Sequence, residues 1–65
     1  MISNSQAVKG TQVTFHRSGH HCDGRIATIG TVVESHDEQD EKLFNLMFDK
    51  GFVGGVSCNE VEIYE

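Results

Sequence analysis

Apolar residues lie in short runs along the chain, and the richest runs lie in its last third. The runs at residues 43–48 and 52–58 flank a D-K-G tripeptide. Its last residue, Gly51, has no Cβ and can adopt the positive φ that a tight hairpin turn requires. The pattern therefore predicts a β-hairpin around Gly51, and the rest of the chain is expected to supply strands that complete its sheet.

Alternation of apolar and polar residues predicts further strands upstream, since side chains of a strand point alternately to its two faces. Val13 and Phe15 alternate with polar neighbours, and no stretch has sustained helical periodicity. Gly30, and the pair Gly54-Gly55, lie inside predicted strands, where glycine is typical of a bulge or a bend. The other expected elements are strands at 12–16, 26–34 and 61–64, loops at 17–25 and 35–42, and a turn or single 3₁₀ turn at 59–60.

The third predicted strand carries apolar residues on both of its faces. Leu43 and Met47 would point one way, and Phe44, Leu46 and Phe48 the other. Two interpretations stay open. Either one set fills the core and the other is covered by long side chains, or some of the large residues, including Phe52 of the next strand, form an exposed patch for a partner or for self-association.

Four sequence pieces follow one another over about residues 9–64: K-G-T-Q-V-T-F, I-G-T-V-V-E, F-N-L-M-F-D-K-G and G-V-S-C-N-E-V-E-I. Their order, with a long first loop and a turn before a short last strand, resembles an SH3-like barrel. Small barrels with similar pieces include the small peripheral subunit of photosystem I, type II dihydrofolate reductases, KOW-type ribosomal modules and cytoskeleton-associated Gly-rich domains. The resemblance implies one all-β domain, a five-stranded barrel over residues 8–65 after a flexible segment at 1–7. It leaves the activity open.

Two of these families can be compared residue by residue. Type II reductases line a tetrameric pore with V-Q-I-Y on a late strand, but the corresponding residues 55–58 read G-V-S-C here. KOW modules are basic, whereas this chain has ten acidic residues, five Lys or Arg, and a net charge of −5. The sequence therefore indicates neither a reductase pore nor a KOW-type nucleic-acid module.

The charge is unevenly distributed. Residues 1–30 carry three cations and one acid, and residues 31–65 carry two cations and nine acids. An acidic surface disfavours binding to phosphate backbones and favours a protein partner. The run at 37–41 is compatible with a solvated loop or with mimicry of a nucleic acid. We expect a cytoplasmic protein, because we find no signal peptide and no run of membrane-spanning length.

The first loop is rich in histidine. His16, His20, His21 and Cys22 lie within seven residues, beside Arg17 and Arg25. Imidazole and thiolate groups bind Zn²⁺ or copper, so His16, His20 and Cys22 are candidate ligands. Adjacent histidines of an extended loop cannot easily share an ion, however, and we expect no metal and no cofactor. We expect Cys22 to be exposed and Cys58 to be a small buried hydrophobe, with a disulfide or shared ion as the other possibility.

We find no nucleophile elbow, P-loop or other catalytic motif, so we expect no enzyme activity. The sequence favours a small acidic binding module, an accessory or regulatory protein that docks on a larger protein. Small barrels of this kind are typical of phage and mobile-element products. An oligomeric enzyme with its site at a symmetry axis and a nucleic-acid-binding barrel are the alternatives, and homo-oligomers stay possible. The expected contact residues are His16, Arg17, His20, His21, Arg25, Phe44, Phe52 and Tyr64.

Overall fold

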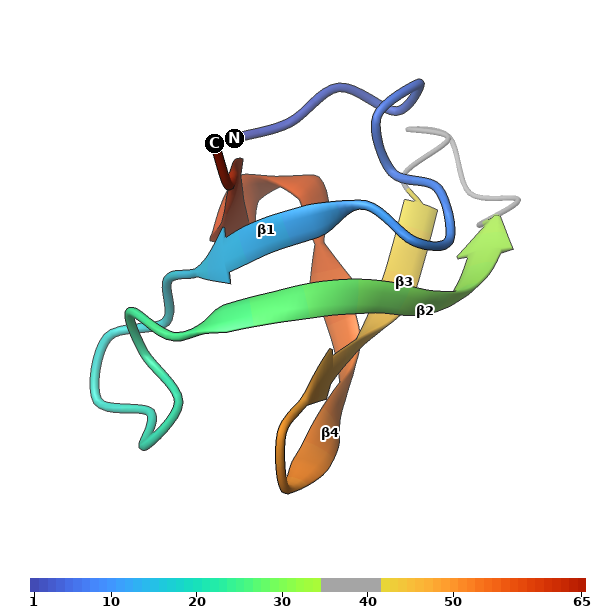
Figure 1. Cartoon of the computed structure of the whole chain (residues 1–65). Coiled ribbons are helices and arrows are strands. Elements are labelled where there is room, and N and C mark those ends of the chain that lie inside the picture. Colours follow the sequence, from blue (N-terminus) through green and yellow to red (C-terminus); the bar gives the residue numbers. More distant parts are fainter. Residues whose placement is uncertain (35–41) are drawn as a thin grey trace.

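A computed structural model describes residues 1–34 and 42–65 of the chain, so most of the predicted acidic loop lies outside the described residues. All five predicted strands are present, with ends within one residue of the prediction (Figure 1). The elements are β1 (Gln12–Phe15), β2 (Ile26–Glu34), β3 (Lys42–Phe48), β4 (Gly51–Ser57), the 3₁₀ helix η1 (Cys58–Glu60) and β5 (Val61–Ile63).

The strands form one antiparallel sheet in the order β4-β3-β2-β1-β5. The all-β class is therefore confirmed, but the sheet of described residues does not close into the predicted barrel. The reason lies in the last elements of the chain. After β4, η1 redirects the backbone so that the three-residue β5 pairs with β1, and no β4–β5 pairing closes the ring.

Both predicted bulges are confirmed by shifts in strand register. Between Ile29 and Val32, β2 has one residue more than the facing part of β3, and Gly30 lies in this step. Between Val53 and Val56, β4 has one residue more than β3, and the two glycines lie there. Bulges bend a sheet and increase its twist, which lets five short strands wrap around one small core.

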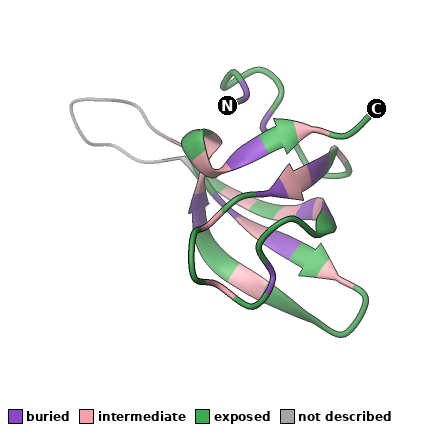
Figure 2. Cartoon of the chain, turned by 90° about the vertical axis from the view of Figure 1, so that its left-hand side faces the viewer, coloured by how far each residue is buried: buried purple, intermediate pink, exposed green. Residues whose placement is uncertain are grey.

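The core lies on the concave side of this bent sheet. Figure 2 shows buried and exposed residues alternating along the strands, as expected for a sheet with one covered face. Phe44 and Leu46 of β3 point into the core, where they meet side chains of the other strands. The largest fully buried side chains are Phe15, Phe44, Ile29, Leu46, Val13, Val56 and Val61.

The N-terminal segment contributes to the core, which its polar sequence did not indicate. Ile2 and Ala7 are buried, and the Ile2 N–H donates to the Cys58 carbonyl over 3.1 Å. The terminal amine pairs with Glu62, and this hydrogen bond lowers the pKa of that carboxyl group. Residues 1–7 were expected to be flexible. Flexibility is a matter of motion, which these contacts do not measure, so it stays a prediction.

Gly55 in the β4 bulge is one of the positions where the backbone conformation favours glycine. Its φ is +67°, and an added Cβ would meet no atom within 4 Å, so the cost of substitution comes from the backbone alone. We expect Gly55→Ala to lower the free energy of unfolding by about 1 kcal/mol. Gly55→Asn should cost less in the same urea denaturation experiment, because asparagine tolerates this region better. An asparagine variant less stable than the alanine variant would contradict this account.

Candidate functional site

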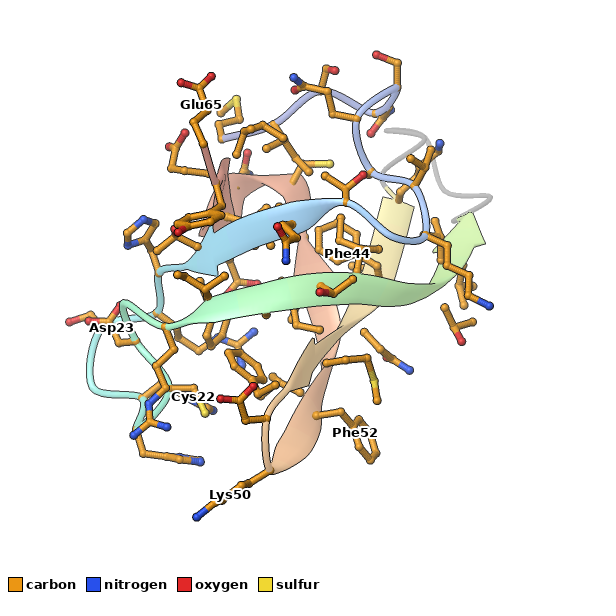
Figure 3. The ribbon with its side chains drawn as sticks, viewed as in Figure 1. Cys22, Asp23, Phe44, Lys50, Phe52 and Glu65 are labelled. Atoms are coloured by element: carbon orange, nitrogen blue, oxygen red, sulfur yellow. The ribbon has the colours of Figure 1, made fainter. Side chains whose placement is uncertain are left out.

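A groove of about 1080 Å³ lies between the β1–β2 loop and the tip of the β3–β4 hairpin, with the start of β2 between them. Glycine turns shape both sides of the groove. The loop turns at Gly19 and Gly24, which both have positive φ, and Gly51 with φ +150° ends the hairpin turn. In Figure 3, Cys22 points from the loop toward the hairpin. The groove lining includes His20, His21, Cys22, Arg25, Ile26, Thr28, Met47, Phe48, Asp49, Lys50 and Phe52.

The groove brings together half of the predicted contact residues: His20, His21, Arg25 and Phe52. Phe44 does not belong to any contact surface in this conformation, because it is only 1 % exposed and packs in the core. Figure 3 shows the difference between Phe44, which lies within the fold, and Phe52, which stands at its outside. The question left open by the sequence is therefore answered: Phe44 and Leu46 are core residues, and Phe52 is exposed.

His16, Arg17 and Tyr64 are not part of the groove lining. His16 is exposed at the end of β1. Tyr64 follows β5 at the edge of the sheet opposite to β4, where its N–H donates to the Gln12 carbonyl. The predicted surface therefore divides into two regions, one around the groove and one along the β1–β5 edge.

Arg17 has a structural role in this arrangement. Its Nε and a terminal guanidinium nitrogen donate to the two carboxylate oxygens of Glu60, over 2.6 and 3.1 Å, and the guanidinium carbon lies 5.1 Å from the centre of the Phe15 ring. Glu60 also accepts a hydrogen bond from the Ser57 N–H over 3.3 Å. These bonds join the start of the β1–β2 loop to η1. The hydrogen bonds from Arg17 are the main reason why the pKa of Glu60 is lowered.

The Arg17–Glu60 pair should make stability depend on pH. We expect Glu60→Gln to lower the free energy of unfolding by about 1 kcal/mol at neutral pH, because the pair is bidentate but partly screened by solvent. A lowered folded-state pKa means that this contribution is present above the ordinary carboxyl pKa of about 4.3 and is lost as the pH falls through the folded value. Urea denaturation of the wild type and of Glu60→Gln should be measured from pH 7 downward. The difference between their free energies of unfolding should shrink only at acidic pH. A difference that is constant across this range would contradict the assignment.

Three potential metal ligands meet on the loop side of the groove. The ligand atoms of His20, His21 and Cys22 lie within 4.8 Å of one another, and His16 is not in this group. The two imidazole rings stack with their centres 4.5 Å apart, and His20 also meets the Phe15 ring edge to face at 5.3 Å. The Cys22 N–H donates to Nδ1 of His20 over 3.0 Å.

The structure corrects the expectation for Cys22. The loop folds back on the sheet, so Cys22 is only 9 % exposed and joins the core, although the polar residues around it predicted an exposed thiol. Cys58 is half-buried and packs against the core from η1. The two cysteines do not form a disulfide with each other.

An uncharged sheet face adjoins the groove, and Phe52 is the one residue of this face that was among the predicted contact residues. Residues paired across neighbouring strands share a face, so Thr28, Met47 and Phe52 form one row. Val33, Leu43 and Ser57 form a second row. With Ile26 on β2 and Asn45 on β3, these two rows make up the surface that we call the outer sheet face.

The outer sheet face is apolar as well as uncharged. It holds five of the eight large hydrophobic side chains that are exposed in the described part of the chain, and Phe52 is the most exposed of these five, at 66 %. The five are Ile26, Val33, Leu43, Met47 and Phe52. A solvent-facing antiparallel sheet normally carries polar residues on that side. Alternation of Leu43, Asn45 and Met47 is the sequence signal that could have located the face once Phe44 and Leu46 were assigned to the core.

Charged groups border this face at the groove. Arg25 and Lys50 line the groove together with one acid, Asp49. The groove therefore carries an excess of positive charge on a protein whose net charge is −5. Carboxylates of a bound partner would meet more complementary charge here than basic groups would.

Within residues 1–34 and 42–65, no helix has both the length and the apolar character needed to cross a membrane. Comparison with known protein families, with curated proteins and with solved structures found no match.

Proposed function

We propose that this protein is a non-catalytic binding module that docks on a larger protein through its outer sheet face. The observation that carries the proposal is the concentration of exposed apolar side chains on β2, β3 and β4. Contiguous apolar surface on a small soluble protein is typical of an interaction site, and a central aromatic residue such as Phe52 is typical of a binding anchor.

The partner surface that fits best combines apolar side chains with carboxylates at one end. The apolar part would lie on Met47 and Phe52, and the carboxylates would meet Arg25 and Lys50 at the groove. This charge pattern disfavours a nucleic acid, because only two of the five Lys and Arg residues are gathered there. The proposal includes an accessory or regulatory role, which the apolar character of this surface supports.

The proposal includes an SH3-like fold. The strand order β4-β3-β2-β1-β5 and the 3₁₀ turn that precedes the last strand support it. Such a small sheet can present one face to a partner while its other face packs on the core. The fold alone does not indicate which partner is bound.

The test compares capture of partners by three immobilised proteins from a lysate of the host cell. Met47→Ser combined with Phe52→Ser should lose at least about 90 % of the partner captured by the wild type, which corresponds to a loss of about 1.4 kcal/mol or more. Tyr64→Ser is the matched control, because Tyr64 is also an exposed aromatic residue but lies at the β5 edge. Thermal unfolding should show that all three proteins are folded.

Equal capture by the wild type and the double variant would contradict the proposal. Loss of capture by Tyr64→Ser alone would place the site on the β1–β5 edge instead. Recovery of nuclease-sensitive nucleic acid in place of a protein would favour the nucleic-acid-binding alternative. A stable symmetric oligomer in light scattering, with no captured protein, would favour an assembly of copies of this chain.

A further inference from the structure

The β1–β2 loop carries three metal-ligating side chains in consecutive positions, and the fold brings all three together. The ligand atoms of His20, His21 and Cys22 lie within 4.8 Å of one another on the wall of the groove. We propose that these three side chains bind one Zn²⁺ ion, and that the fourth position of the ion is open toward the groove. The expectation of a metal-free loop is replaced by this proposal.

The shape of the loop removes the sequence-based objection to such a site. Neighbouring residues of an extended chain point to opposite sides, which would separate the two imidazoles. This loop is not extended, because the His20 N–H donates to the Arg17 carbonyl and the Asp23 N–H donates to the His20 carbonyl, each over 3.0 Å. The turns place both imidazole rings on one side, where they stack at an interplanar angle of 20°.

The donor set and the spacing suit zinc. Two imidazoles and one thiolate are ligands that Zn²⁺ prefers, and sites with three protein ligands keep a fourth position for water or another donor. Ideal bond lengths require about 3.3 Å between two nitrogen ligands and about 3.6 Å between nitrogen and sulfur. The three atoms must therefore approach by about 1.5 Å at most. His21 is exposed and can rotate to do so, whereas Cys22 is held at a buried position.

Asp23, the acid next to these three residues in the sequence, is hydrogen-bonded to the backbone and is not part of the proposed site. An Asp23 carboxylate oxygen accepts a hydrogen bond from the Arg17 N–H over 2.9 Å, and in Figure 3 its side chain points away from the hairpin. Asp49, by contrast, lines the same groove as the three ligands. The open position is thus accessible to water, to Asp49 or to a donor of a bound partner.

Zinc binding must change one hydrogen bond of the metal-free loop. The Cys22 N–H donates to Nδ1 of His20 over 3.0 Å. If zinc binds Nε2 of His20, the neutral ring carries its proton on Nδ1 and can no longer accept this bond. If zinc binds Nδ1 of His20, the ion occupies the position from which the Cys22 N–H donates in the metal-free loop. Either way the Cys22 amide loses its acceptor, so its NMR resonance should move on addition of Zn²⁺.

Cobalt titration of the reduced, tag-free protein is the direct test. One equivalent of Co²⁺ should produce a thiolate-to-cobalt charge-transfer band and the visible bands of tetrahedral cobalt, and Zn²⁺ should then displace the cobalt. Cys22→Ser and His21→Ala should each weaken binding by at least about 100-fold, since even outer-shell changes cost 10–100-fold. Cys58→Ser and His16→Ala are the matched controls, because neither residue belongs to the cluster, and both should bind as the wild type does.

Absence of a charge-transfer band in the wild type would overturn the proposal. So would unchanged affinity in His21→Ala, whose exposed side chain can be removed without disturbing the core. If Cys58→Ser or His16→Ala abolishes binding instead, the ion lies elsewhere and the assignment is wrong. All of these measurements use the isolated chain, so their outcome is independent of whether the outer sheet face binds a partner.

Discussion

Phe44→Ala should lower the free energy of unfolding by a large part, whereas Phe52→Ala should change it little. Phe44 is 1 % exposed and lies in the core beside Leu46, so its removal leaves a cavity. Phenylalanine-to-alanine changes in cores cost about 3–5 kcal/mol. A domain of 65 residues has a total stability of about 3–10 kcal/mol. Removal of the Phe44 side chain therefore costs a large part of the free energy of unfolding.

Urea denaturation followed by circular dichroism measures both variants. For Phe52→Ala we expect a change of no more than about 1 kcal/mol, because this side chain is 66 % exposed and buries little surface. Similar midpoints for the two variants would contradict the assignment of Phe44 to the core. The pair of variants thus separates the two interpretations that the sequence alone left open for these residues.

Ile2→Ala should have the second largest effect. Ile2 is 4 % exposed and packs in the core cluster, so truncation to alanine should lower the free energy of unfolding by about 2–4 kcal/mol. The matched control is Val8→Ala, since Val8 lies just after this segment and before β1 but is exposed. Its expected effect is about 0.5 kcal/mol or less.

The same urea experiment measures these two N-terminal variants. Equal stability of Ile2→Ala and the wild type would mean that the N-terminal segment does not pack on the core in solution. The expected flexibility of residues 1–7 would then be supported. A large loss confined to Ile2→Ala would instead show that this segment contributes to the fold.

Local chemistry made most of the strand pattern predictable. Alternation located β1 and β2, and the turn sequence before Phe52 located the hairpin. Glycine inside strands indicated both bulges, because a residue without a Cβ is favoured where the ladder is interrupted. These features depend on neighbours along the chain, and for that reason a single sequence could reveal them.

Features that depend on contacts between distant residues were not predictable in the same way. Ile2 looked like part of a polar terminus, yet its N–H donates to the Cys58 carbonyl at the far end of the sequence. Arg17 looked like a free cation of a binding loop, yet Glu60 engages it from η1. Cys22 looked exposed, yet the loop folds it onto the core. Each of these outcomes depends on which segments the fold places side by side.

The candidate site was predictable in part for the same reason. His20, His21 and Arg25, which are close in sequence, line one groove, and Phe52, also among the predicted contact residues, joins them from the hairpin. The outer sheet face needed the strand register, since only cross-strand pairing shows that Met47 lies between Thr28 and Phe52. Periodicity along one strand defines two faces but does not say which one the core covers.

Photo-crosslinking from two single positions tests the central claim most directly. A photoreactive phenylalanine analogue would replace Phe52 in one protein and Tyr64 in another, because both are exposed aromatic residues at opposite edges of the sheet. If the outer sheet face is the docking surface, illumination with the captured partner should give a covalent adduct mainly from position 52. Adducts from position 64 that equal or exceed those from position 52 would contradict the claim.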